Sequence, residues 1–132
     1  MNRSMAVFYL MLATLFTHEL DAMAQSEWRL LYVLRSLPSA EGQFWFVVLH
    51  VPLFAGLFGL LQHASSRVRQ FTQVSLAVFA VVHAGLHYRL SAEPLYTFLS
   101  PLSLALIYGA ALLGLLFLLL SRHKLLEPSS RQ

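Results

Sequence analysis

Four long apolar segments constrain this chain more than any other feature of its sequence. They cover residues 5–23, 44–62, 68–88 and 101–121, which is most of the 132 residues. A helix of roughly 20 residues, rising about 1.5 Å per residue, crosses a hydrocarbon core about 30 Å thick. Because 58% of the residues are hydrophobic and only 11% are charged, a soluble domain of this length would lack polar surface. The sequence therefore predicts an all-α integral membrane four-helix bundle forming one domain over residues 1–132.

The first segment also resembles a secretory signal peptide. Arg3 precedes the apolar stretch, and Ala22-Met23-Ala24 imitates a cleavage site. Three further apolar segments of similar length follow, as expected for an anchored bundle. We therefore expect the first segment to be a membrane span.

The basic residues predict how the bundle is oriented. With four spans, both termini and the connection between the second and third spans lie on one side. That side carries Arg3, Arg67, Arg69, Arg122, Lys124 and Arg131. The other side carries Arg29, Arg35 and Arg89. Because basic residues near span ends stay in the cytoplasm, we expect a multi-pass protein with both termini cytoplasmic.

The connection between the first two spans is predicted to contain a short interfacial helix over about residues 26–37. Ser26 is a suitable helix cap and Glu27 suits the first turn. The stretch that follows, "WRLLYVLRSL", places its apolar side chains on one side, and Pro38 ends it. This helix would act as a lid over the outer end of the bundle. The tail, residues 122–132, is expected to lie outside the bundle and to be disordered at its end.

The fourth segment carries small residues at helical spacing. Ala105 and Gly109 are four residues apart, as are Ala110 and Gly114. Such spacing lets a second helix approach closely, so this face is a candidate surface for a homo-oligomer. Membrane lipid is the other expected partner. A nucleic-acid partner is not expected, because no run of basic residues alternates with aromatic residues.

Four of the histidines are predicted to lie at one level of the membrane. The first span runs outward and ends shortly after His18, whereas the second runs inward and reaches His50 about 10 Å below the outer boundary. The third runs outward again and ends near His83 and His87. An ionisable residue inside a span costs about 2.5–3.5 kcal/mol unless it faces a partner, water or protein. The four side chains are therefore expected to form one polar pocket in the outer half of the bundle.

The spacing of these residues suits a metal site. His83 and His87 are four residues apart, on one helix face, which is a common way to present two imidazoles to one ion. His18 and Asp21 share a face of the first span, while Glu19 points about 100° away from His18. We therefore predict that the four histidines bind zinc or iron. Glu19 and Asp21 would serve as catalytic carboxylates by ligating, orienting an imidazole or moving a proton.

Three functions are compatible with this pocket. The first is a metal-dependent membrane enzyme that acts on a lipid-like substrate at the outer face. The second is electron transfer through a b-type haem held by His50 with His83 or His87. The third is a non-enzymatic scaffold, assembly factor or transport partner in which the polar cluster is structural. The chain has no cysteine, which excludes thiolate nucleophiles, disulfide chemistry and iron–sulfur clusters.

Three short motifs carry a family resemblance. "THELDA" at 17–22, "EWRLL" at 27–31 and "LHVPLF" at 49–54 resemble a bacterial family of small four-span inner-membrane proteins with no established activity. The likeness covers most of the chain through the third segment. It implies the four-span fold and a location in the bacterial inner (plasma) membrane. It brings no catalytic residues to this sequence.

Overall fold

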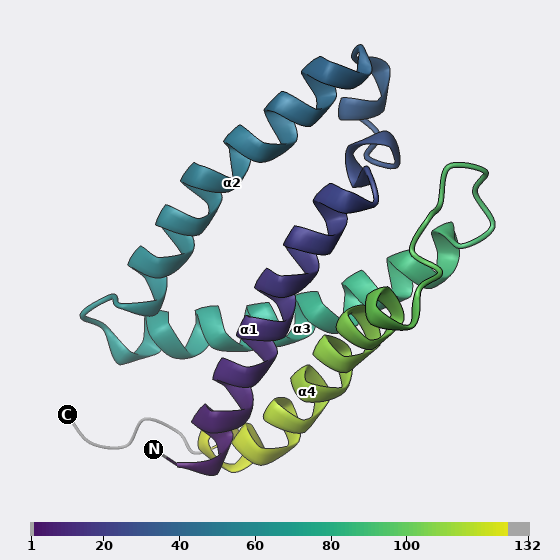
Figure 1. Ribbon diagram of the computed structural model, residues 1–132. Coiled ribbons are helices and arrows are strands. Elements are labelled where there is room, and N and C mark those ends of the chain that lie inside the picture. The colour runs from purple at the N-terminus through teal and green to yellow at the C-terminus, as the bar shows by residue number, and fades with distance from the viewer. Residues whose placement is uncertain (1, 127–132) are drawn as a thin grey trace.

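The protein is all-α over the part of the chain that the computed structural model describes, residues 2–126. The elements, in chain order, are α1 (Arg3–Ala24), η1 (Glu27–Arg29), η2 (Leu34–Ser36), α2 (Ser39–Leu61), α3 (Ser66–Leu90) and α4 (Pro101–Leu126) (Figure 1). The predicted fold class is thereby confirmed. Because α4 continues to Leu126, the first residues of the predicted tail are helical. Residues 127–132, where disorder was predicted, lie outside the described residues.

The ends of the helices follow from local sequence. The Asn2 side chain accepts a hydrogen bond of 2.9 Å from the Met5 N–H and so caps α1. At the start of α4, the Ser100 hydroxyl accepts a bond of 3.0 Å from the Ser103 N–H. Pro101 occupies the first helical position, where its missing N–H costs nothing.

Three helices are long and apolar enough to cross a membrane: Ser39–Leu61, Ser66–Leu90 and Pro101–Arg122. This composition indicates a membrane protein. Helix α1 has a similar length, but His18, Glu19 and Asp21 near its C-terminal end lower its mean hydropathy. Its passage through a membrane stays a prediction.

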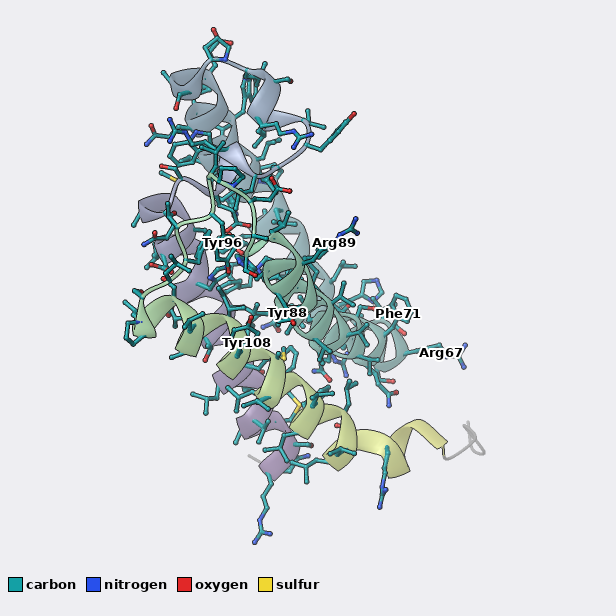
Figure 2. All side chains as sticks on the ribbon, turned by 90° about the vertical axis from the view of Figure 1, so that its right-hand side faces the viewer. Arg67, Phe71, Tyr88, Arg89, Tyr96 and Tyr108 are labelled. Atoms are coloured by element: carbon teal, nitrogen blue, oxygen red, sulfur yellow. The ribbon has the colours of Figure 1, made fainter. Side chains whose placement is uncertain are left out.

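Helices α1, α3 and α4 pack together, while α2 leans away from them (Figure 1). The core between the three packed helices is formed by Phe8, Met11, Leu12, Leu15, Ala77, Ala80, Ala110 and Phe117. In α2, by contrast, only Gly42 and Phe46 are buried. Exposed side chains such as Arg67 and Phe71 project outward from the start of α3 (Figure 2). The helix that leans away leaves space beside α1 and α3.

The segment 26–37 differs from the single helix predicted for it. It forms two separate 3-10 turns, η1 and η2. Ser26 adopts a left-handed conformation with φ 59°, which turns the chain directly after α1. The turns then pack inward on α2, since a Cβ at Gly42 would lie 3.0 Å from Trp28 Cδ1 and 3.1 Å from the Leu34 carbonyl oxygen. Packing against the neighbouring helix has overridden the helical pattern.

The small residues of α4 serve packing within the chain. A Cβ at Gly114 would lie 2.8 Å from the Ala77 carbonyl oxygen of α3, whereas nothing lies within 4 Å of one at Gly109. A homo-oligomer through the Ala105/Gly109/Gly114 face stays a prediction, with Gly114 already in contact with α3.

We expect Gly114→Ala to destabilise the protein by about 1–3 kcal/mol, because the new methyl group forces α3 and α4 apart. Gly109→Ala is the matched control. It adds the same methyl group to the same helix in open space, and should raise stability by roughly 0.5–1 kcal/mol through helix propensity. Thermal unfolding in detergent, followed by circular dichroism, measures both. Equal effects of the two substitutions would contradict the close α3–α4 contact.

Candidate metal centre

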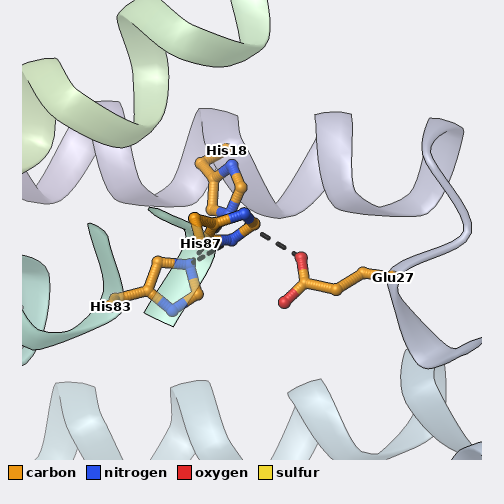
Figure 3. Close-up of side chains that lie close together, drawn as sticks. All are labelled: His18, Glu27, His83 and His87. Atoms are coloured by element: carbon orange, nitrogen blue, oxygen red, sulfur yellow. Dashed lines mark hydrogen bonds and ion pairs between the residues drawn. The ribbon is translucent and has the colours of Figure 1, made fainter. Parts of the chain in front are cut away.

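Four side chains from three parts of the chain meet at one point. They are His18 of α1, Glu27 of η1, and His83 and His87 of α3, which we call the metal-ligand group. Each offers one ligand atom, and these four atoms all lie within 4.8 Å of one another. Figure 3 shows the side chains turned toward a common centre. The polar pocket predicted from the sequence therefore has a compact counterpart in the structure.

The three imidazoles face one another through the same ring atom. His83 Nε2 lies 2.9 Å from His18 Nε2 and 3.1 Å from His87 Nε2. The i and i+4 spacing on α3 brings His83 and His87 to one face, and the packing of α1 supplies His18. His18 and His87 are almost fully buried, at 1% and 3% exposure. A neutral imidazole has one N–H and one lone pair, so three convergent nitrogens need a proton or a cation between them.

Glu27 supplies the fourth ligand atom. Its carboxylate oxygen Oε2 lies 3.7 Å from His18 Nε2, is buried and accepts no hydrogen bond. Burial raises the pKa of Glu27 to about 8, with a further contribution from the nearby Glu19 and Asp21 carboxylates. A buried carboxylate oxygen without a donor, facing three imidazole nitrogens, is what a metal ion would satisfy.

The distances suit a first-row transition metal. Zinc binds imidazole nitrogen at about 2.0–2.1 Å, which places tetrahedral ligand atoms about 3.3 Å apart. The separations of 2.9, 3.1 and 3.7 Å that involve His18 and His83 bracket this value. Imidazole and carboxylate are also the donors that zinc and iron accept. The residues present therefore form a group that fits such an ion.

The loop before α4 supports this centre. The Tyr96 hydroxyl lies 3.2 Å from His87 Nδ1, so the second ring nitrogen of His87 has a partner that holds the ring in place. Burial raises the pKa of Tyr96 to about 12, which keeps the hydroxyl protonated. Phe98 is fully buried against the rings of His18 and His87. Tyr96 (Figure 2) and Phe98 were not identified from the sequence.

His50 lies outside this group and pairs with Glu19. Its Nε2 is 3.0 Å from Glu19 Oε2, and its Nδ1 is 2.6 Å from the Phe46 carbonyl oxygen. The structure thus brings three of the four predicted histidines together, while the fourth forms a separate pair between α2 and α1. Neither carboxylate predicted to be catalytic is in the metal-ligand group. Asp21 Oδ1 lies 3.5 Å from Gln25 Nε2, and its buried Oδ2 has no hydrogen-bond partner.

Glu27 is the member of this group that sequence analysis missed. Its position after Ser26 suggested the first turn of a helix, with the carboxylate near the helix end. The left-handed Ser26 instead turns η1 back over the end of α1. The single signal in the sequence was its place in "EWRLL", one of the three motifs that carry the family resemblance.

A cavity of about 360 Å³ connects the metal-ligand group with the Glu19–His50 pair. Its polar lining consists of Glu27, His83 and His87 together with Glu19 and His50. The rest of its lining is apolar: Leu30, Leu31, Leu34, Phe46, Leu49, Leu53, Phe79, Leu86 and Leu90. A mostly apolar cavity with a few convergent polar groups is typical of a small-molecule site.

Comparison with curated proteins and with solved structures finds no match for this chain. A family model does match, over residues 4–124, and its description is a family of unknown function (DUF6713). The expected resemblance to an uncharacterised family is confirmed to that extent, and the match includes all four residues of the metal-ligand group. The chain belongs to this family of unknown function, DUF6713.

Proposed function

We propose that this protein is a metal-dependent membrane enzyme in which His18, Glu27, His83 and His87 hold one zinc or iron ion. A single observation carries the proposal. The buried Glu27 Oε2, which accepts no hydrogen bond, faces three Nε2 atoms that converge on one another. A purely structural network would be expected to pair its buried polar atoms, because each unpaired one costs about 1–3 kcal/mol.

The same convergence favours an ion over a haem. In a bis-histidine haem the two imidazoles bind from opposite faces of a flat macrocycle. Here His83 Nε2 lies 2.9 Å from His18 Nε2 and 3.1 Å from His87 Nε2, so the nitrogens surround a point and leave no plane between them. His50, the remaining partner considered for a haem, is engaged with Glu19.

The cavity supports a catalytic role for the ion. When bound, such an ion lowers the pKa of a coordinated water toward about 7 and polarises a carbonyl or ester oxygen. The chain's own residues position the reactants. His83 and His87 open on the cavity, and the Glu19 carboxylate lies across it with His50 as its hydrogen-bond partner. Glu19 is thereby suited to take up or deliver a proton, and His50 to hold that carboxylate in place.

Asp21 has a different part in this proposal. Its carboxylate is near enough to Glu27 to disfavour a second negative charge there. A bound cation relieves that repulsion, so Asp21 strengthens the preference of this site for a positive ion. We place the centre near the outer face of the bacterial inner membrane, with both termini in the cytoplasm, as the distribution of basic residues favours.

The test uses the intact protein in two steps. Protein purified in detergent is analysed for metals and visible absorption, with about one zinc or iron per chain and no Soret band expected. It is then placed in liposomes made from total bacterial lipid, with and without a chelator, in air. Mass spectrometry of extracted lipid should show a species that is consumed only by the metal-loaded protein. A stoichiometric ion with unchanged lipids would contradict the enzymatic part of the proposal, and no ion would contradict all of it.

A further inference from the structure

A second apolar cavity continues from the first, away from the metal-ligand group. Its volume is about 270 Å³, and it shares Glu19, Leu53 and Phe79 with the first cavity. Its remaining lining residues are Leu12, Leu15, Phe16, Phe54, Leu57 and Leu76. The two cavities together form one groove between α2 on one side and α1 and α3 on the other, which we call the α2 groove.

The length of the α2 groove matches one leaflet of a membrane. Along α2, its lining residues extend from Phe46 to Leu57, which is about 16 Å at about 1.5 Å per residue. Half of a hydrocarbon core about 30 Å thick is about 15 Å. The groove therefore fits within one leaflet, and its part from His50 to Leu57, about 10 Å long, can hold a hydrocarbon chain that points toward the midplane.

The α2 groove is open along its side and closed at its floor. Leu49, Leu53 and Phe79 at its edge are 51%, 58% and 48% exposed, whereas Leu12 and Leu15 at its floor are buried. Because α2 and α3 are apolar enough to cross a membrane, the open side would face lipid. A lipid chain could enter sideways without crossing water.

The polar groups of the α2 groove line its first cavity, whereas the second cavity is apolar apart from Glu19. The Glu19–His50 pair lies where the two cavities join, and Glu27, His83 and His87 lie beyond it. Both ring nitrogens of His50 are already engaged, whereas the second carboxylate oxygen of Glu19 can accept a hydrogen bond from a hydroxyl. An anionic head group is less suitable here, because the Glu19 and Glu27 carboxylates already line the first cavity.

We propose that the α2 groove binds the hydrocarbon chain of an uncharged single-chain amphiphile with a hydroxyl head group, such as a monoacylglycerol. A head-group hydroxyl donates a hydrogen bond to Glu19, and the head group faces the metal centre. A reaction of the head group at the metal centre rests on the proposed function, but binding of the hydrocarbon chain in the groove does not. Lipid-chain binding is therefore tested separately from metal chemistry.

The probe is a long-chain monoacylglycerol with a photoreactive diazirine near the methyl end of its chain. The metal-free protein in detergent is irradiated with it, and peptide mass spectrometry locates the cross-links. We expect them on Leu12, Phe54, Leu57 or Leu76, with competition by the unlabelled lipid. Leu57→Trp, which fills the groove, should remove them. Leu112→Trp is the matched control, because Leu112 is 67% exposed on α4, outside the groove lining.

Leu53→Trp provides a second blocking variant at an exposed groove residue, in case Leu57→Trp disturbs folding. Cross-links spread evenly over the exposed faces of α2 and α4, or unchanged in both blocking variants, would overturn the groove proposal. The His18→Gln variant separates the two proposals, because His18 belongs to the metal-ligand group but lines neither cavity, so the groove should still be labelled when the metal centre is disabled. If the groove is labelled but the wild-type protein binds no metal, lipid-chain binding is supported and the proposed function is contradicted.

Discussion

Replacing His83 by Gln is expected to abolish stoichiometric metal binding while the helices remain folded. His83 Nε2 is the central atom of the group, at 2.9 Å from His18 Nε2 and 3.1 Å from His87 Nε2. Loss of an outer hydrogen-bond partner alone costs metal sites about 10–100-fold in affinity, so loss of the central ligand should cost more than about 100-fold. Metal content per purified chain and helix content by circular dichroism measure the two effects.

The matched control is His50→Gln, the same substitution at the histidine that the structure pairs with Glu19. It should keep the metal, because His50 is outside the metal-ligand group. If His83→Gln unfolds the protein, His87→Gln repeats the test on the same helix. Retention of the metal by both α3 variants would overturn the site. Loss of metal in His50→Gln to the same extent would restore the four-histidine site predicted from the sequence.

The common depth of the histidines was predictable because it depends on helix geometry alone. Direction and rise per residue place His18, His83 and His87 at one level, and the i and i+4 spacing brings two of them to one face. The lateral position of α2 was not predictable in this way. It depends on how η1 and η2 pack on Gly42 and Phe46. His50 therefore lies at the expected level but forms a different pair.

The carboxylate of the candidate metal centre was not predictable from helical periodicity. Glu19 and Asp21 were considered because they lie beside His18 in the sequence. Glu27 reaches the centre because a single residue, Ser26, adopts a left-handed conformation that few sequence patterns specify outside glycine. Packing of Trp28 and Leu34 against α2 replaces the predicted interfacial helix by two 3-10 turns. Both differences thus depend on how the chain turns and packs after the end of α1, which helical periodicity does not specify.

Protonation of Glu27 is expected to lower the metal affinity about tenfold for each pH unit below about pH 8. The pKa of Glu27 is raised from 4.5 to about 8 by burial and by the neighbouring carboxylates. At a pH between 4.5 and about 8, the metal-free protein holds a proton on Glu27, whereas the metal-bound carboxylate has none. Binding therefore releases one proton, and lower pH opposes it by about 1.4 kcal/mol per unit.

The Glu27→Gln variant isolates this contribution. Glutamine cannot ionise, so the variant should bind metal more weakly at pH 8 and lose the Glu27 part of the pH slope. The three histidines of the metal-ligand group are present in both proteins, so the difference between the two slopes isolates the contribution of Glu27. Glu41→Gln, at an exposed residue in the first turn of α2, is the control and should keep the wild-type slope. Competition with a metal-sensitive dye from pH 6 to pH 7, well below the pKa of Glu27, measures all three proteins. Identical slopes in wild type and Glu27→Gln would mean that Glu27 does not exchange its proton for the ion.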